Sequence, residues 1–189
     1  GFTLVELAIV LVIIGIIMGA VLRGQQMIEG AKLKRLYNQQ REIAAAFYTY
    51  YDKYGKFPGD DNTVATRGGV WATSVNGDSD GLIEVTFAYS CSGAEATGAE
   101  SCNAWSHLRL ANIISGSGRT NPSHAHGGAV SAAYGTVNTV PANWIAFQNV
   151  PGDAALSIDT QYDDGVYNTG TIQGSAVYTG AVTDLYSKL

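Results

Sequence analysis

The first 54 residues constrain the fold more than any other part of this 189-residue chain. Residues 7–22 contain nothing more polar than glycine, so this run approaches the roughly 20 apolar residues that cross a bilayer core. Apolar residues then recur at three- and four-residue spacing as far as Tyr54, and no proline occurs before Pro58. The pattern predicts one helix over residues 1–54, on the order of 80 Å long. Its front, residues 1–22, would contact lipid or other copies of the chain, and residues 23–54 would be amphipathic.

Glu6 is the one charged residue within this apolar front. An ordinary membrane anchor does not explain it, because an unpaired carboxylate is costly in lipid. A cleaved signal peptide would begin with basic residues, whereas the first basic residue here is Arg23. In a bundle of identical helices, Glu6 can pair with the terminal amine of a neighbouring copy. Any other stagger would leave a buried charge unpaired, so we predict that Glu6 sets the register of an assembly.

The segment GFTLVELAIVLVIIGII resembles the N-terminal motif of type IV pilins and of the pseudopilins of type II secretion. The resemblance covers about the first 30 residues, and it implies that a prepilin peptidase cuts after Gly1 and methylates Phe2. It also implies that the precursor waits in the inner membrane until an assembly machinery extracts it. Two departures are visible: Gly1 is present, and Arg23-Gly24 stands where many pilins have a helix-breaking proline. We predict that any melted helical segment in a filament lies within residues 15–24, where glycines weaken the helix.

Residues 55–189 are predicted to form a small α+β body. Gly55 and Pro58 end the long helix, and residues 103–112 read as a short one. Five apolar segments separated by glycine and asparagine favour an antiparallel sheet with long loops; they are 129–137, 143–150, 154–159, 165–172 and 175–180. A long helix packed on such a sheet is the type IV pilin-like layout that the resemblance implies.

The stretch NGDSDGLIE, residues 76–84, carries oxygen side chains at alternate positions, as calcium loops do. A full EF-hand needs a bidentate acid at its twelfth position, where Phe87 stands. Glu84 or an acid distant in sequence would therefore have to complete the shell. The pattern predicts a calcium site, and an Asx-rich turn without metal is the alternative. The predicted ligands are Asn76, Asp78, Asp80, Leu82 and Glu84.

A second acidic group comprises Asp153, Asp159, Asp163 and Asp164, and the last two directly precede Gly165. It fits a tight turn between extended segments or a share in a metal site.

Cys91 and Cys102 bracket a polar loop of small residues. A zinc site would need four ligands, and no further cysteine or histidine lies within the loop. We therefore favour a disulfide over two free thiols. A disulfide would place the body in an oxidising compartment.

The charge is divided between the two parts of the chain. Residues 1–56 hold seven basic and four acidic residues, whereas residues 57–189 hold four basic and twelve acidic ones. An acidic body does not offer the basic face that nucleic-acid binding requires. The sequence also lacks a nucleophile elbow, a phosphate-binding loop and a zinc signature. These absences predict that the chain is not an enzyme and has no nucleic-acid partner.

The sequence thus predicts a structural subunit of a type IV pilus-like extracellular filament, a homo-oligomer built through its N-terminal helix. The first alternative is a pseudopilin that forms a periplasmic fibre in type II secretion. The second is a membrane-anchored monomeric binding domain, which Glu6 argues against because a lone anchor gains nothing from a buried acid.

Overall fold

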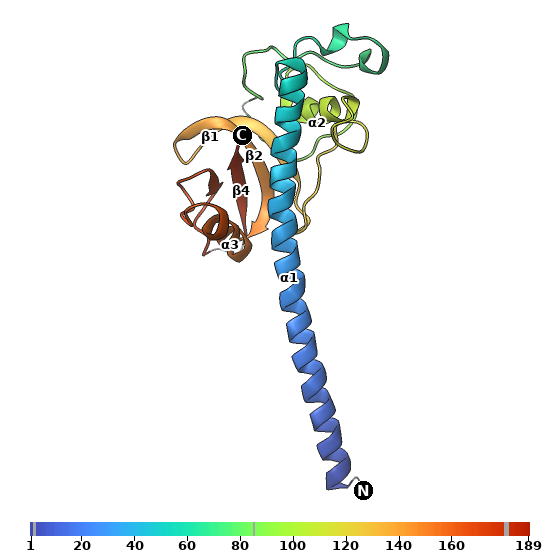
Figure 1. Ribbon diagram of the computed structural model, residues 1–189, viewed down its shortest axis with the longest axis vertical. Helices are drawn as coiled ribbons and strands as arrows, with labels where there is room; N and C mark the ends of the chain where they lie inside the picture. Colours follow the sequence, from blue (N-terminus) through green and yellow to red (C-terminus); the bar gives the residue numbers. More distant parts are fainter. Residues whose placement is uncertain (2, 85, 180–181) are drawn as a thin grey trace.

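A computed structural model describes residues 1, 3–84, 86–179 and 182–189 and shows a long helical rod with a small body around one end (Figure 1). Helix α1 runs from Leu4 to Tyr54 without interruption. Thr3 caps its start, and Gly55 ends it at φ 73°, a left-handed conformation that favours glycine. The single long helix predicted from the sequence is therefore present, beginning at Leu4 rather than at residue 1, and the fold is α+β.

The rear half of α1 packs into the body, and the front half does not touch it. Every described residue from Thr3 to Arg23 is exposed. The buried side chains of α1 recur at three- and four-residue intervals on one face; they are Leu36, Gln40, Ile43, Ala46, Phe47 and Tyr50. The helical periodicity of the sequence thus marks the face that meets the body, where Leu33 is the first partly buried apolar residue and Leu36 the first fully buried one.

The body contains a four-stranded antiparallel sheet in the order β1-β2-β4-β3. The strands are β1 (Val130–Val137), β2 (Val140–Pro151), β3 (Ile172–Gly174) and β4 (Val182–Lys188). Strands β1 and β2 form a hairpin whose two loop residues, Asn138 and Thr139, both have positive φ. That geometry matches the right-handed twist of the paired strands.

The core lies between the rear of α1, the sheet and two short helices, α2 (Glu100–Leu110) and α3 (Gly152–Tyr162). Two short 3-10 helices, η1 (Val64–Thr66) and η2 (Gly69–Trp71), lie in the loop that follows α1. The largest fully buried side chains include Trp105 of α2, Trp144 of β2 and Phe47 of α1. The predicted helix at 103–112 is therefore present, beginning three residues earlier.

The strand predicted at residues 154–159 is wrong, because this segment belongs to α3. Its buried residues, Ala154, Ala155, Ile158 and Asp159, follow helical spacing, and alanine and leucine favour a helix. Pro151 precedes the first turn, and Asp153 lies within it, where an acid is favourable. The segments predicted as strands at 165–172 and 175–180 are mostly turns where the structure describes them, with β3 beginning at Ile172; residue 180 lies outside the described residues.

Cys91 and Cys102 form a disulfide with a Cα–Cα distance of 5.4 Å, as predicted. It links the long loop to α2. Replacing both cysteines with alanine should lower the free energy of unfolding by about 3 kcal/mol, because the unfolded chain gains the freedom of an opened loop. Thermal unfolding of the full-length chain in detergent measures this effect. Adding a reductant should destabilise the wild type to a similar extent and leave the double variant unchanged; an equal response in both would contradict the prediction.

Candidate functional site

The first candidate functional feature is the exposed, apolar front of α1, residues 4–22. In the part of the chain that the structure describes, this is the one helix long and apolar enough to span a membrane, and none of its apolar window is buried. A Cβ atom added at any glycine of this region would meet nothing within 4 Å; these are Gly15, Gly19, Gly24 and Gly30. Contacts within the chain therefore do not explain these glycines.

Glu6 has a local role that our sequence interpretation missed. Its carboxylate accepts hydrogen bonds of 2.8 Å from both the backbone N–H and the hydroxyl of Thr3. The Glu6 N–H in turn donates to the Thr3 hydroxyl at 3.3 Å, which completes a capping box. The Thr-x-x-Glu spacing could have revealed this role. Gly1 is exposed, and Phe2, the predicted methylation site, lies outside the described residues.

The second feature is a group of acids beside the end of α1. Asp60 and Asp61 follow the helix and are both buried, but their surroundings differ. Asp61 accepts hydrogen bonds from the Tyr50 hydroxyl at 2.8 Å and from Thr63, and it forms an ion pair with Arg67. Burial alone would raise the pKa of Asp61, but these partners hold it below its usual value. Asp61 is therefore a fully partnered structural carboxylate.

Asp60 is only 2% exposed, yet its carboxylate is incompletely satisfied. Asp60 Oδ2 accepts a hydrogen bond from the Gly81 N–H at 3.2 Å. Oδ1 is buried and has no hydrogen-bond partner among the described residues. Burial, followed by the negative charge of Glu100, raises the pKa of Asp60 to about 6.

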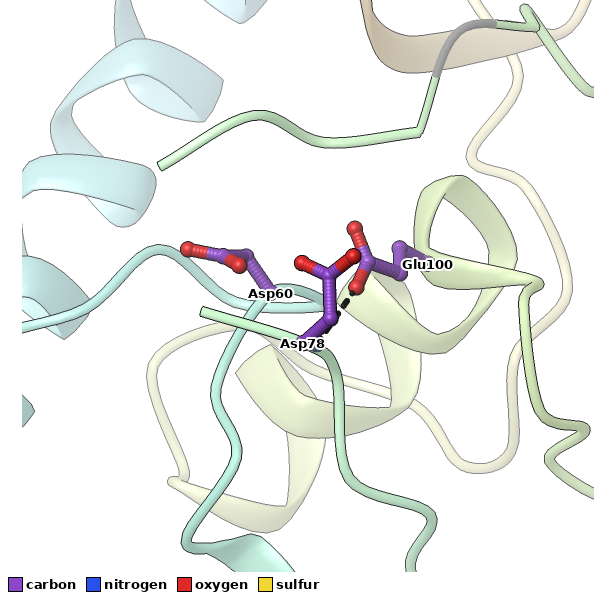
Figure 2. A group of neighbouring side chains, drawn as sticks. All are labelled: Asp60, Asp78 and Glu100. Atoms are coloured by element: carbon purple, nitrogen blue, oxygen red, sulfur yellow. Dashed lines mark hydrogen bonds between the residues drawn. The ribbon is translucent and has the colours of Figure 1, made fainter. Parts of the chain in front are cut away.

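Asp60, Asp78 and Glu100 form one carboxylate group, in which one oxygen from each side chain lies within 4.8 Å of the others (Figure 2). Glu100 opens α2 and accepts the backbone N–H groups of Asp78 at 3.0 Å and Glu84 at 3.2 Å. Burial and the charges of Asp78 and Asp80 raise the pKa of Glu100. None of the three acids takes part in an ion pair with a described residue.

Two glycines allow the segments that carry these acids to approach closely. A Cβ atom at Gly77 would lie 2.3 Å from the Gly59 carbonyl oxygen, and one at Gly59 would lie 2.4 Å from the Glu100 carbonyl oxygen. Gly59 also has a positive φ of 93°. The backbones after α1, in the 76–84 loop and at the start of α2 are thus packed directly against one another.

All five predicted calcium ligands line a single pocket of about 400 Å³, which Glu100 also lines. Asp78 joins the carboxylate group. The side-chain oxygens of Asn76 and Asp80 instead accept backbone N–H groups, from Ala65 at 2.9 Å and from Leu82 at 2.8 Å. Our sequence interpretation anticipated an acid distant in sequence but identified neither Asp60 nor Glu100.

The second acidic group also gathers in space, with one carboxylate oxygen each from Asp159, Asp163 and Asp164 within 4.8 Å of one another. The carboxylates of Asp159 and Asp163, however, accept hydrogen bonds from described residues. Asp159 accepts from the Gly165 N–H and the Tyr178 hydroxyl, and Asp163 accepts from the N–H of Ile172 at 2.7 Å. These contacts support a structural turn, but it follows helix α3 and does not join two extended segments as predicted.

No protein-family model matches this chain, and searches of curated proteins and of solved structures give no match either. The resemblance of residues 1–30 to the pilin motif therefore stays a prediction from the sequence. The function has to be argued from the bare helix and the body that it carries.

Proposed function

We propose that this chain is a structural subunit of a type IV pilus-like extracellular filament, assembled through its N-terminal helix. The observation that carries the proposal is the exposed apolar front of α1, in which none of the most hydrophobic window is buried. Soluble monomers rarely expose contiguous apolar patches larger than a few hundred Å². This surface needs an apolar partner, either lipid or the same surface on other copies.

Identical helices are a suitable partner because the front of α1 is apolar on all sides. Exposed large apolar residues occur at successive positions from Ile9 to Ile14, so no single stripe would be satisfied by one flat contact. A helix of this kind is fully covered either in a bilayer or at the centre of a bundle. Moving it from lipid to a bundle exchanges one apolar environment for another.

Releasing a subunit from the filament into water would instead expose the apolar front of α1 to solvent. Exposing a buried Leu, Ile or Val side chain costs about 1.5–3 kcal/mol, and the front of α1 carries many of them. We therefore expect filaments that resist dilution. The precursor would reside in the inner membrane, and the disulfide-bonded body would lie on its oxidising side.

The capping box formed by Thr3 and Glu6 is compatible with both a filament subunit and a monomeric membrane anchor. Thr3 and Glu6 satisfy each other at the start of the helix, so Glu6 has a local role even in a monomeric anchor. The presence of Glu6 therefore does not by itself separate a filament from an anchor. The register role of Glu6 and the assembly both need a direct test.

Cryo-electron microscopy of fibres sheared from cells that produce the chain tests the proposal. We expect a core of α1 helices from several copies, with residues 4–22 inside and the bodies outside. Fibres found only in the periplasm and bound to a secretion machinery would instead support a pseudopilin. A chain that stays monomeric in cells and after detergent removal would contradict both and support the anchored binding domain.

A further inference from the structure

We propose that Asp60, Asp78 and Glu100 bind one divalent cation, calcium in preference to magnesium, which joins the end of α1 to the 76–84 loop and to α2. The three acids come from three separate segments of the body. Cation binding by the body does not require filament assembly, so it can be tested independently of the proposed function.

Asp60 has a buried carboxylate oxygen without a hydrogen-bond partner among the described residues. Its side chain is 2% exposed, and Oδ1 lacks a hydrogen bond among the described residues. A buried carboxylate oxygen without a partner is destabilising, because it loses its contacts with water and gains none in return. A cation held between Asp60 and the neighbouring acids would supply the missing interaction.

The negative charge of this group is not balanced by an ion pair with a described residue. Three carboxylates meet within 4.8 Å, and no lysine, arginine or histidine of the described chain forms an ion pair with any of them. Lys56, a basic residue near this loop, donates instead to Asn62 and Ser79.

The ligand atoms of the three acids favour calcium over other cations. All three side chains offer carboxylate oxygens, the hard ligands that calcium and magnesium prefer. Calcium accepts six to eight oxygens in flexible geometry, whereas magnesium demands a tight octahedron. Asp78 and Glu100 line one pocket together with Asp80 and Glu84, and Asp60 lines a neighbouring pocket that Asp80 also lines, so further oxygens are close at hand. This irregular, oxygen-rich setting favours calcium.

The cation would organise a part of the body that has little regular structure. Between the end of α1 and the start of α2, the described residues form only two 3-10 helices of three residues each. The disulfide holds one end of this region to α2. A cation at Asp60, Asp78 and Glu100 would hold the other end, next to the rod.

The primary test is calorimetric titration of the metal-free, full-length chain in detergent with calcium chloride and, separately, magnesium chloride. We expect one calcium site with a Kd on the order of 10⁻⁴ M, typical of extracellular modules, and weaker magnesium binding. At 10 mM calcium the midpoint of thermal unfolding should rise by about 5–10 °C. A flat titration with an unchanged midpoint would overturn the proposal.

Variants locate the ion. Asp78→Asn changes an exposed side chain and should fold, but its calcium response should be lost. Asp60→Asn should also lose the response, while its metal-free midpoint should be no lower than that of the wild type, because a buried repulsive charge is removed. If Asp60→Asn fails to fold, Asp78→Asn and Glu100→Gln still decide the matter.

Two matched controls remove one carboxylate elsewhere. Asp52→Asn lies on an exposed part of α1, and Asp164→Asn lies in the second acidic group. Both should keep the full calcium response. Loss of the response in Asp164→Asn together with its retention in Asp78→Asn would overturn the proposal and assign the ion to the second group.

Hydrogen exchange gives an independent readout. The backbone amides of Asp78 and Glu84 donate to Glu100, so a bound ion should slow exchange in peptides covering residues 76–84. The protection should appear in the wild type and in Asp52→Asn but not in Asp78→Asn. Equal exchange with calcium and with chelator would count against the site.

Discussion

Replacing Glu6 with glutamine should reduce filament yield by at least about tenfold while leaving the body folded and the chain in the membrane. Breaking a buried charge pair by removing one partner costs about 3–5 kcal/mol, and each 1.4 kcal/mol is a factor of ten in an equilibrium. In the proposed filament, Glu6 pairs with the terminal amine of a neighbouring copy. The measurement is the amount of sheared fibre, normalised to the chain found in membranes.

Glutamine is the informative substitution because it separates two roles of Glu6. A glutamine at this position can still complete a capping box with Thr3, but it carries no charge. The matched control is Thr3→Ala, which removes the capping hydroxyl and keeps the carboxylate. If the charge sets the register, Glu6→Gln should fail to assemble and Thr3→Ala should assemble.

The opposite pattern would show that helix capping is the role of Glu6. Normal yield from both variants would leave the acid with no part in assembly. Glu29→Ala serves as a further control, because Glu29 is an exposed acid on the same helix beyond the apolar run. Its effect on yield should be small, since an exposed ion pair such as Glu29–Lys32 contributes at most about 1 kcal/mol.

The sequence predicts α1 well because the signal is local and repeated. Apolar spacing runs through fifty residues, and glycine and proline mark the end at Gly55 and Pro58. The strands are less well predicted, since each is short and depends on its partners. Residues 154–159 show the difficulty: a short apolar run fits both a strand and a helix, and only its packing in α3 decides between them.

The candidate metal site shows a second limit. Asp78 could be found because the NGDSDG pattern is contiguous. Asp60 and Glu100 could not, because they lie in other segments and approach Asp78 only through the packing at Gly59 and Gly77. Residues brought together by tertiary structure leave no spacing signature in a single sequence. The close approach at Gly77 is therefore visible in the structure alone.

The buried ion pair beside this site should dominate the stability of the end of α1. Asp61 is fully buried and binds Arg67, whose guanidinium carbon lies 3.8 Å from the ring centroid of Tyr54 and 4.9 Å from that of Trp71. Asp61→Ala should lower the free energy of unfolding by about 3–5 kcal/mol, because Arg67 loses its ion-pair partner and the Tyr50 hydroxyl loses its acceptor.

A double-mutant cycle tests whether the pair acts as a unit. Arg67→Ala should also be strongly destabilising, since Asp61 is then left buried without its cation. The double variant should cost less than the sum of the single ones, with a coupling energy of about 1–3 kcal/mol. Denaturant unfolding of the full-length chain in detergent with a chelator present measures all four proteins without any contribution from a bound cation.

The matched control is the same cycle on Glu29 and Lys32, an ion pair of comparable geometry with side chains 59% and 37% exposed. Solvent screens such a pair, so its coupling should stay below about 0.5 kcal/mol. Equal coupling in the two cycles would show that burial does not strengthen the Asp61–Arg67 pair. Strong coupling at Asp61–Arg67 alone would show that burial strengthens this ion pair, which contacts Tyr50 and Tyr54 at the end of α1.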